Sequence, residues 1–323
     1  MEIISNCTKD VIKKAAQALK DGHLVAFPTE TVYGLGADAT NEKAVSRIYS
    51  VKGRPVDHPL IVHITSINQL DNWAIEIPDY AIKIAREFWP GPITLILKRS
   101  HLAQDFITGC QDNVGIRVPS QSVALALLSE FEKLGGLGIA APSANRFGAV
   151  SPTNIKAVKE ELGIFLQTED LILDGGQSLI GIESTIIDCT KDHPVILRPG
   201  AITAEMIENI LGVRIVLGKT KNDIKVSGLL ESHYSPKARV LLDTQAKPGN
   251  GLIAFSSVPT PIGVIRLAEP HNIEEYAKVL YSALREADKK GIEVVIVVLP
   301  TGSGLATAII DRLKKASRKS VTE

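Results

Sequence analysis

Residues 24–36 read Leu-Val-Ala-Phe-Pro-Thr-Glu-Thr-Val-Tyr-Gly-Leu-Gly. The first four are apolar and predict a short buried strand, which Pro28 ends because proline has no N–H for strand pairing. The hydroxyl side chains of Thr29 and Thr31 follow directly. Loops at strand ends line the crevice in which α/β sheets bind ligands. The stretch therefore predicts a sheet with a polar site at its edge.

Strand and helix patterns alternate irregularly on both sides of this stretch. Helices are expected from a cap at Thr8 to Asp21, and then at 41–51, 66–73, 78–88, 121–131, after Pro152 and at 203–211. Strands are expected at 24–27, 59–64, 94–97, 115–118, 138–141, 171–173, 184–188 and 195–197. Because the order is not a strict strand–helix–strand repeat, the pattern predicts an α/β fold: a mixed, twisted, open sheet flanked by helices.

A polar segment broken by Gly228 and Pro236 separates this part from the rest of the chain. Strands at 239–242, 251–255, 262–266 and 293–298, with helices at 273–287 and 304–317, then predict a small parallel, Rossmann-like domain. We therefore predict a first domain over 1–217, a linker that acts as a lid over 218–237, and a C-terminal α/β domain over 238–323.

The composition narrows the class of protein. The 323 residues carry 36 Lys+Arg and 36 Asp+Glu, so the net charge is zero and bulk electrostatic coating of nucleic acid is disfavoured. The three cysteines form no CxxC pair, which argues against a zinc knuckle or redox dithiol and suits a reducing cytoplasm. No stretch approaches the roughly 18 apolar residues of a membrane span. A cytoplasmic protein with no membrane partner is expected.

Common catalytic motifs are absent or misplaced. Gly34–Ala39 and Gly136–Ala141 match GxGxx(G/A), but neither directly joins a strand to a helix as a dinucleotide site requires. There is no GxxxxGK[ST], GxSxG or HExxH sequence. The sequence therefore argues against a P-loop nucleotide hydrolase, a serine hydrolase with the GxSxG motif and a zinc protease with the HExxH motif.

Cationic side chains recur at the ends of predicted elements: Lys52, Arg54, Arg117 and Arg198. These cationic residues and the hydroxyl residues near them also have ordinary structural explanations that need no ligand. Lys52-Gly53-Arg54 suits a helix C-terminus, Ser151-Pro152 suits a helix start, and Ser184 and Thr185 suit a strand. Arg117 lies in an apolar strand, where a guanidinium needs an anion or a carboxylate. Together the set suits a polyphosphate and a carboxylate, because guanidinium groups match both anions.

Six ordered motifs resemble the YrdC family over about residues 8–212: Phe27–Gly36, Lys52-Gly53-Arg54-Pro55, Ala141-Pro142-Ser143-Ala144-Asn145, Ser151-Pro152-Thr153, Asp174-Gly175-Gly176 with Glu183-Ser184-Thr185, and Leu197-Arg198-Pro199-Gly200. The linker Ser232–Pro236 and the tail Ala308–Leu313 resemble its two-domain form, the threonylcarbamoyl-AMP synthases. One departure is Ser227-Gly228-Leu229, where the family commonly reads Pro-Gly-Met; the loss of that proline should loosen the lid. Another is Asn113, which replaces an expected hydroxyl residue.

The resemblance implies a nucleotidyltransferase. The family condenses L-threonine, bicarbonate and ATP, with Mg²⁺ on the nucleotide, into threonylcarbamoyl-adenylate and pyrophosphate. The product feeds a downstream tRNA threonylcarbamoyl transferase that modifies adenosine 37. Direct RNA binding is possible in this family and not required.

The resemblance also implies site residues. L-threonine contacts are expected from Thr31, His63, Arg117, Ala141 and Ser184. ATP contacts are expected from Arg54, His58, Asn113, Ser143, Ser151, Arg198 and Tyr234. Catalytic roles are expected for Lys52, Arg54, Ser143 and Asn145, and no protein side chain is expected to hold a metal.

Two other functions compete with this interpretation. An RNA-binding module would use the same cationic surface, and it would show steep salt dependence. The C-terminal helix, with Arg312, Lys314, Lys315, Arg318 and Lys319, could dock a partner protein or tRNA. A solvated terminal helix is the simpler interpretation of that charge run, and it is the one we favour.

Overall fold

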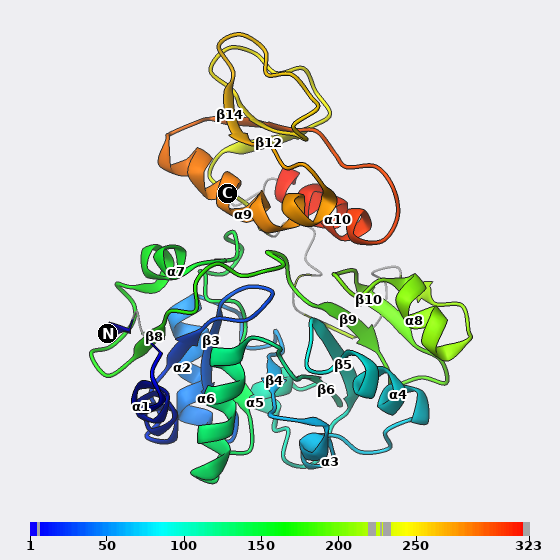
Figure 1. Ribbon diagram of the computed structural model, residues 1–323. Coiled ribbons are helices and arrows are strands. Elements are labelled where there is room, and N and C mark those ends of the chain that lie inside the picture. The colour runs from blue at the N-terminus through cyan, green and yellow to red at the C-terminus, as the bar shows by residue number, and fades with distance from the viewer. Residues whose placement is uncertain (5–6, 219–223, 227, 229–233, 319–323) are drawn as a thin grey trace.

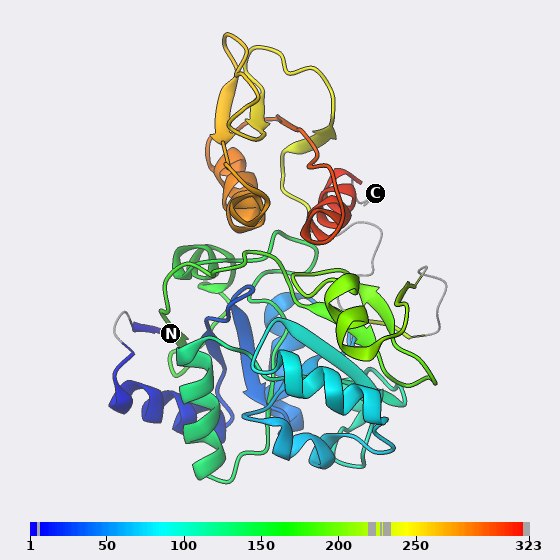
Figure 2. The same cartoon turned by 45° about the vertical axis from the view of Figure 1, so that its right-hand side comes forward.

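The computed structural model describes residues 1–4, 7–218, 224–226, 228 and 234–318. It contains a large and a small sheet, each with its own helices (Figure 1). The small sheet and helices α9 and α10 lie above the large part in the view of Figure 1, with the two helices between the sheets. A view turned by 45° shows the same arrangement (Figure 2). The predicted fold class, a mixed open sheet plus a small parallel sheet, is confirmed.

In the part of the chain that the structure describes, the large sheet has eleven strands in the order β1-β8-β2-β3-β7-β4-β6-β5-β9-β10-β11. Parallel and antiparallel neighbours both occur: β4 runs parallel to β6, whereas β5 runs antiparallel to it. The bounds are β1 Glu2–Ile4, β2 Val25–Phe27, β3 Gly34–Asp38, β4 Ile61–His63, β5 Ile93–Lys98, β6 Asn113–Arg117, β7 Ile139–Ala140, β8 Leu171–Leu173, β9 Thr185–Asp188, β10 Val195–Arg198 and β11 Val216–Leu217.

Helices cover both faces of this sheet because its strands are apolar on both sides. Val25 and Phe27 pack with α1 and α6, while the alternate residues Leu24 and Ala26 pack in the cluster that contains α2. The bounds are α1 Lys9–Lys20, α2 Glu42–Lys52, α3 Leu70–Trp73, α4 Asp79–Phe88, α5 Asp105–Thr108, α6 Ser122–Lys133, α7 Ile155–Leu162 and α8 Ala204–Leu211, with a 3₁₀ turn at Ile67–Gln69.

Strand β3 is the largest difference from the sequence-based expectation, which had no strand at Gly34–Asp38. The segment pairs antiparallel with β2 on one side and β7 on the other. Gly36 is required there because a Cβ would lie 2.7 Å from the Ile139 Cγ2 atom and 2.8 Å from Phe27 Cε1. The GxG pattern at Gly34–Gly36 therefore serves close strand packing.

Strand β7 joins two groups of strands. On one side lie β1, β8, β2 and β3, and on the other lie the six strands from β4 to β11 in the sheet order. β7 has two residues, Ile139 and Ala140, and it pairs antiparallel with β3 and with β4. The middle of the sheet is therefore a narrow seam.

The small sheet is parallel throughout, in the order β12-β15-β13-β14. Its elements are β12 Arg239–Leu242, β13 Gly251–Ile253, β14 Ile265–Ala268, α9 Ile273–Lys289, β15 Val294–Val297 and α10 Leu305–Ser317. Strand β11 ends in the large sheet at Leu217 and β12 begins the small sheet at Arg239. The division into 1–217, 218–237 and 238–323, and the lid, stay predictions.

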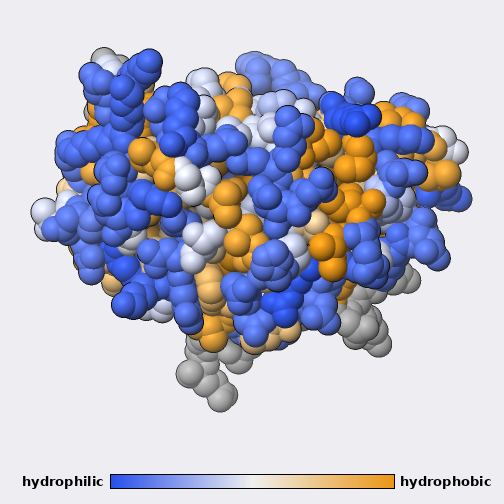
Figure 3. All heavy atoms as spheres, turned by 90° about the horizontal axis from the view of Figure 1, so that it is seen from below, coloured by the Kyte–Doolittle hydropathy of each residue, from blue (hydrophilic) through white to orange (hydrophobic). Residues whose placement is uncertain are grey.

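Seen from the end opposite the small sheet, the surface is mostly hydrophilic, with hydrophobic residues in patches between (Figure 3). Across the described ranges, none of the helices is both long enough and apolar enough to cross a membrane.

Candidate active site

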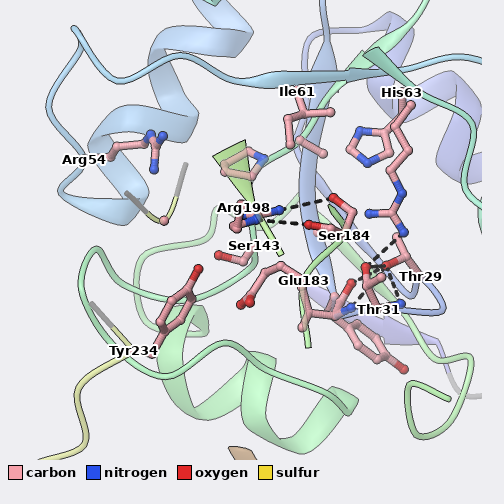
Figure 4. Close-up of a pocket in the computed structure, with 17 residues that line it drawn as sticks. Thr29, Thr31, Arg54, Ile61, His63, Ser143, Glu183, Ser184, Arg198 and Tyr234 are labelled. Atoms are coloured by element: carbon pink, nitrogen blue, oxygen red, sulfur yellow. Dashed lines mark hydrogen bonds between the residues drawn. The ribbon is translucent and has the colours of Figure 1, made fainter. Parts of the chain in front are cut away.

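A pocket lies where strands β2, β4, β6 and β10 end and β9 begins (Figure 4). Nine of its lining residues were expected at a substrate site: Thr31, Arg54, His63, Arg117, Ala141, Ser143, Ser184, Arg198 and Tyr234. The other lining residues are Thr29, Val32, Tyr33, Gly34, Ile61, Pro142, Glu183 and Gly228. In Figure 4, Arg54 and Tyr234 lie on one side, His63 and Thr31 on the other, and Arg198 and Ser184 between them.

Arg117 ends β6 and is buried beside the loop at residues 28–32 that follows β2. Its Nη2 donates to Glu30 Oε1 at 2.7 Å and to Thr31 Oγ1 at 3.0 Å, and its Nε donates to the Gly91 carbonyl at 3.4 Å. The Nη1 group takes part in none of these bonds. Glu30 supplies the carboxylate that a buried arginine requires, and Nη1 is left to face a second anion.

His63 ends β4, the strand directly beside β6, and its register partner is Arg117. Burial and the neighbouring guanidinium of Arg117 lower the pKa of His63 to about 3. Its Nδ1 atom is buried and makes no hydrogen bond within the described part of the chain. A neutral imidazole with a spare polar atom on the pocket wall suits a hydrogen-bonding ligand.

Ser184 and Arg198 meet at the centre of the pocket. Arg198 Nε donates to the Ser184 carbonyl at 3.0 Å, and its Nη2 donates to Ser184 Oγ at 3.1 Å. The Ser184 hydroxyl also lies 2.8 Å from Thr94 Oγ1. Figure 4 shows the two bonds between Arg198 and Ser184 as dashed lines. Each side chain therefore fixes the orientation of the other.

Lys52 holds the loop that carries Ser143 and does not line the pocket. Its ammonium donates to the carbonyls of Ser143 and Asn145 at 2.6 and 2.5 Å. Burial and the neighbouring Arg54 hold the pKa of Lys52 well below its ordinary value. The Asn145 amide donates to the Arg146 and Ala149 carbonyls, which closes the same loop. Lys52 and Asn145 thus shape the backbone that presents Ser143.

Arg54 follows the left-handed Gly53 that ends α2. It donates to the carbonyls of His58 and Pro59 at 3.3 and 2.9 Å, and its guanidinium lies over the Phe147 ring. Burial lowers the pKa of Arg54 to about 10. His58 packs edge-on against the same ring, with 5.2 Å between the ring centroids. His58 thus supports Arg54 from outside the pocket lining.

Two further expected residues do not line this pocket. Asn113, which begins β6, lines a neighbouring cavity with Gln111, Ile224, Lys225 and Val226, and Ile61 borders both spaces. Ser151 is fully buried and donates to Glu183 Oε1 at 2.7 Å. The departures noted at Ser227 and Leu229 lie outside the described residues.

Tyr234 comes from the segment between the sheets and is buried against α9 and α10. These helices and the small sheet (residues 239–317) are called the small domain below, and the part that contains the large sheet is called the large domain. Its ring stacks on Tyr281 with 5.7 Å between centroids and 22° between planes. The Arg312 guanidinium carbon lies 5.4 Å from the ring centroid. The aromatic edge of the pocket is thus built partly on helices α9 and α10.

Sequence reasoning missed four residues: Glu30, Glu183, Tyr281 and Arg312. Glu30 lies between Thr29 and Thr31, and the need of Arg117 for a carboxylate was the signal for it. Glu183 accepts from Tyr281 and from Arg312, whose side chain is fully buried. The interpretation of the final helix as solvated is therefore wrong at Arg312, because its charge pairs with a buried carboxylate of the large domain.

The arginines and hydroxyls at the strand ends of the mixed sheet define a protein that binds anionic substrates. The family model Sua5_yciO_yrdC, described as telomere recombination, matches residues 17–200. A second model, described as the threonylcarbamoyl-AMP synthase C-terminal domain, matches residues 202–318. The chain therefore belongs to the Sua5/YrdC family, in the form that carries this C-terminal domain.

Relatives cover nearly the whole chain. Threonylcarbamoyl-AMP synthase of Pyrococcus abyssi is 42% identical, over 98% of this chain and 98% of that protein. The Bacillus subtilis protein of the same name is 37% identical, over 95% and 92%. The crystal structure of Pyrococcus abyssi Sua5 complexed with L-threonine superposes with a TM-score of 0.88 at 39% identity, covering 98% of both chains. The expected family is confirmed.

Proposed function

We propose that this chain is a threonylcarbamoyl-AMP synthase. The observation that carries the proposal is a single pocket lined by three arginines, Arg54, Arg117 and Arg198, together with hydroxyl side chains. Guanidinium groups at separate places in one pocket suit a carboxylate at one end and phosphates at the other. The names of the full-length relatives support the same activity.

In the proposal, L-threonine occupies the side of the pocket near Arg117. The free Nη1 of Arg117 faces the carboxylate, and the unbonded Nδ1 of His63 and the hydroxyl of Thr31 face polar atoms of the substrate. Ala141 provides an apolar wall, and Ser184 borders the reacting end. The relative crystallised with L-threonine supports threonine as the amino acid.

ATP occupies the side near Arg54, Arg198, Ser143 and Tyr234. Arg54 and Arg198 lie where they offset phosphate charge, which builds up as the α-phosphorus is attacked. Lys52 and Asn145 act on Ser143 through the loop backbone, and Ser151 acts through Glu183. His58 supports Arg54, and Asn113 faces the adjoining cavity, which suits a more distant part of the nucleotide.

The reaction that the family carries out would use these positions in two steps. The threonine amine attacks bicarbonate and forms a carbamate with loss of water. A carbamate oxygen then attacks the α-phosphorus of ATP, the bond to the β-phosphate oxygen breaks, and pyrophosphate leaves. Carbamates decompose in water, so a closed pocket protects the intermediate.

Mg²⁺ belongs to the nucleotide substrate in this proposal. Within the described part of the chain, no three His, Cys, Asp or Glu side chains are grouped to hold a metal ion. The nearby carboxylates of Glu30 and Glu183 are each ion-paired with an arginine. These side chains do not fit a protein-held metal, whereas ATP phosphates bind Mg²⁺ readily.

The product would feed a downstream tRNA threonylcarbamoyl transferase, in keeping with a cytoplasmic role in tRNA modification. The zero net charge favours supply of a small molecule over direct binding of the tRNA. RNA binding therefore stays a secondary prediction, and a salt titration of tRNA binding tests it.

The decisive experiment measures pyrophosphate release with ATP alone, and then with threonine, bicarbonate or both. We expect release only when both are present, together with threonylcarbamoyl-adenylate by mass spectrometry. ATP turnover that is indifferent to threonine would contradict the proposal.

A further inference from the structure

Glu183 borders the pocket but is bonded mainly by the other domain. Its Oε2 accepts from Tyr281 at 2.9 Å and from Arg312 Nε at 2.8 Å, across 98 and 129 residues of sequence. Its Oε1 accepts from Ser151 at 2.7 Å. The residue is 6% exposed. A buried carboxylate with these three donors is held in one orientation.

Arg312 ties together two strand ends. Besides Glu183, which precedes β9, it donates from Nη2 to the carbonyl of Pro199, which follows β10, at 3.0 Å. Since β9 and β10 run antiparallel, these two points lie at the same end of the strand pair. That end presents Ser184 and Arg198 to the pocket.

The same two side chains support the aromatic edge of the pocket. Tyr281 stacks on Tyr234, and the guanidinium of Arg312 lies over the Tyr234 ring. Tyr281 of α9 and Arg312 of α10 thus form one buried cluster. This cluster contacts Glu183 next to Ser184, Pro199 next to Arg198, and Tyr234 itself.

Glu183 is unsuited to accepting a proton. Burial alone would raise its pKa, but the charges of Arg312 and Arg198, together with the hydrogen bonds from Ser151 and Arg312, outweigh burial and lower the pKa to about 2. Its oxygens are already used by three donors. Its position on the pocket wall is better explained by the neighbouring pocket residues, such as Ser184, that it holds in place.

We propose that Glu183 is a positioning residue, and that Arg312 and Tyr281 of the small domain act through it and through Pro199 to place Ser184, Arg198 and Tyr234 for ATP. The inference rests on the proposed function. It gives the small domain a part in the reaction from behind the pocket wall, where it contacts no substrate.

Conservative variants test the inference. Arg312→Lys keeps the charge but loses the fork that reaches both Glu183 and Pro199, and Tyr281→Phe keeps the ring stack but loses the bond to Glu183. Each should raise the KM for ATP about tenfold, the loss expected for one hydrogen bond to a buried charge. The KM for threonine should move less. Of the residues proposed to face threonine, Ser184 adjoins this cluster, whereas Arg117 is held separately by Glu30 and Thr31.

Two comparisons separate a positioning effect from a loss of folded protein. The first compares kcat with KM: a smaller fraction of active protein lowers the apparent kcat and leaves both KM values unchanged. Lys289→Gln is the matched control, because Lys289 pairs with Glu160 at 3.0 Å across the same two domains, outside the pocket lining. Its KM for ATP should equal that of the wild type.

Glu183→Gln should raise the KM for ATP as Arg312→Lys does. Combining the two should cost less than the product of the single effects, because both break one contact. If Arg312→Lys does not fold, Tyr281→Phe decides.

Folded Arg312→Lys and Tyr281→Phe proteins with the wild-type KM for ATP would overturn the inference. If the wild type lacks threonine-dependent pyrophosphate release, the proposed function fails instead. Calorimetric ATP affinities of the same variants then still test the positioning, because they need no turnover.

Discussion

The two sheets contribute to the pocket in different ways. Loops and strand ends of the large sheet supply the lining from Thr29 to Arg198, and the intervening segment adds Gly228 and Tyr234. The small sheet and its helices supply none of the lining residues found, yet Tyr281 and Arg312 hold residues that do line it. A domain can therefore belong to an active site through the residues that it holds in place.

The largest expected effect is on the stability of the large domain. Arg117→Ala leaves Glu30 as an unpaired buried charge, so the free energy of unfolding should fall by about 3–5 kcal/mol. Chemical denaturation measures this. Adding Glu30→Gln should restore part of the loss, because the stranded charge is removed. If Arg117→Ala alone is as stable as the wild type, the ion pair between Arg117 and Glu30 does not stabilise this end of the pocket.

A loss of catalysis is next in size. Arg54→Ala removes a cation that faces the phosphates in the proposed reaction, so pyrophosphate release should fall by about 10²–10³-fold. Saturating ATP, threonine and bicarbonate isolate the effect in kcat. Lys43→Ala is the control, because Lys43 is an exposed lysine near the start of α2, the helix that Arg54 follows. Full activity of the Arg54 variant would end the assignment of the large domain as the phosphate-binding region.

A pH effect of intermediate size should come from His63. Its pKa is lowered from an ordinary value near 6.5 to about 3 in the folded chain, so the unfolded chain binds more protons between these values. Stability is therefore full above pH 6.5 and falls by about 1.4 kcal/mol per pH unit for this group as the pH drops. Unfolding curves from pH 7.5 to 5 measure it, and His63→Gln should show a flatter profile. Equal slopes would contradict the burial of a neutral imidazole.

The smallest expected effect concerns how the small domain receives the chain. Asp288 on α9 accepts from the backbone N–H groups of Lys237 and Ala238 at 3.0 and 2.9 Å. Asp288→Asn should lower the free energy of unfolding by about 1 kcal/mol and leave pyrophosphate release near the wild-type rate. A large loss of activity would mean that the path of the chain into β12 matters more to Tyr234 than the Glu183 cluster does.

The sequence predicted most helices and strands, because the periodicity of their apolar residues was clear. The missed strand β3 shows the limit: Gly34, Gly36 and Ala37 have low strand propensity, and the segment is a strand because β2 and β7 enclose it. The expected helix at 66–73 divides into a 3₁₀ turn and one helical turn, α3.

The sequence predicted the site residues that belong to local motifs. It did not predict contacts between side chains that lie far apart along the chain. Arg117, His63 and Ser184 line one pocket as expected. The pairing of Glu183 with Arg312 spans 129 residues and two domains, and no spacing along the chain reveals it. The charge run on the last helix suggested solvent exposure, because sequence alone does not show which of several cations is buried.

The narrow seam at β7 has a consequence for the motion of the sheet. Thr31 and Thr29 belong to the β2 side of the seam, whereas Arg117 and Ser184 belong to the β4 side. Arg117 already ties the two sides, because its guanidinium donates to Glu30 and Thr31. A substrate that contacts both sides would add a second tie between the two half-sheets. Amide protons of Ile139 and Ala140 should exchange with deuterium more slowly once both substrates are bound, so that these two residues report occupancy of the pocket from within the backbone itself.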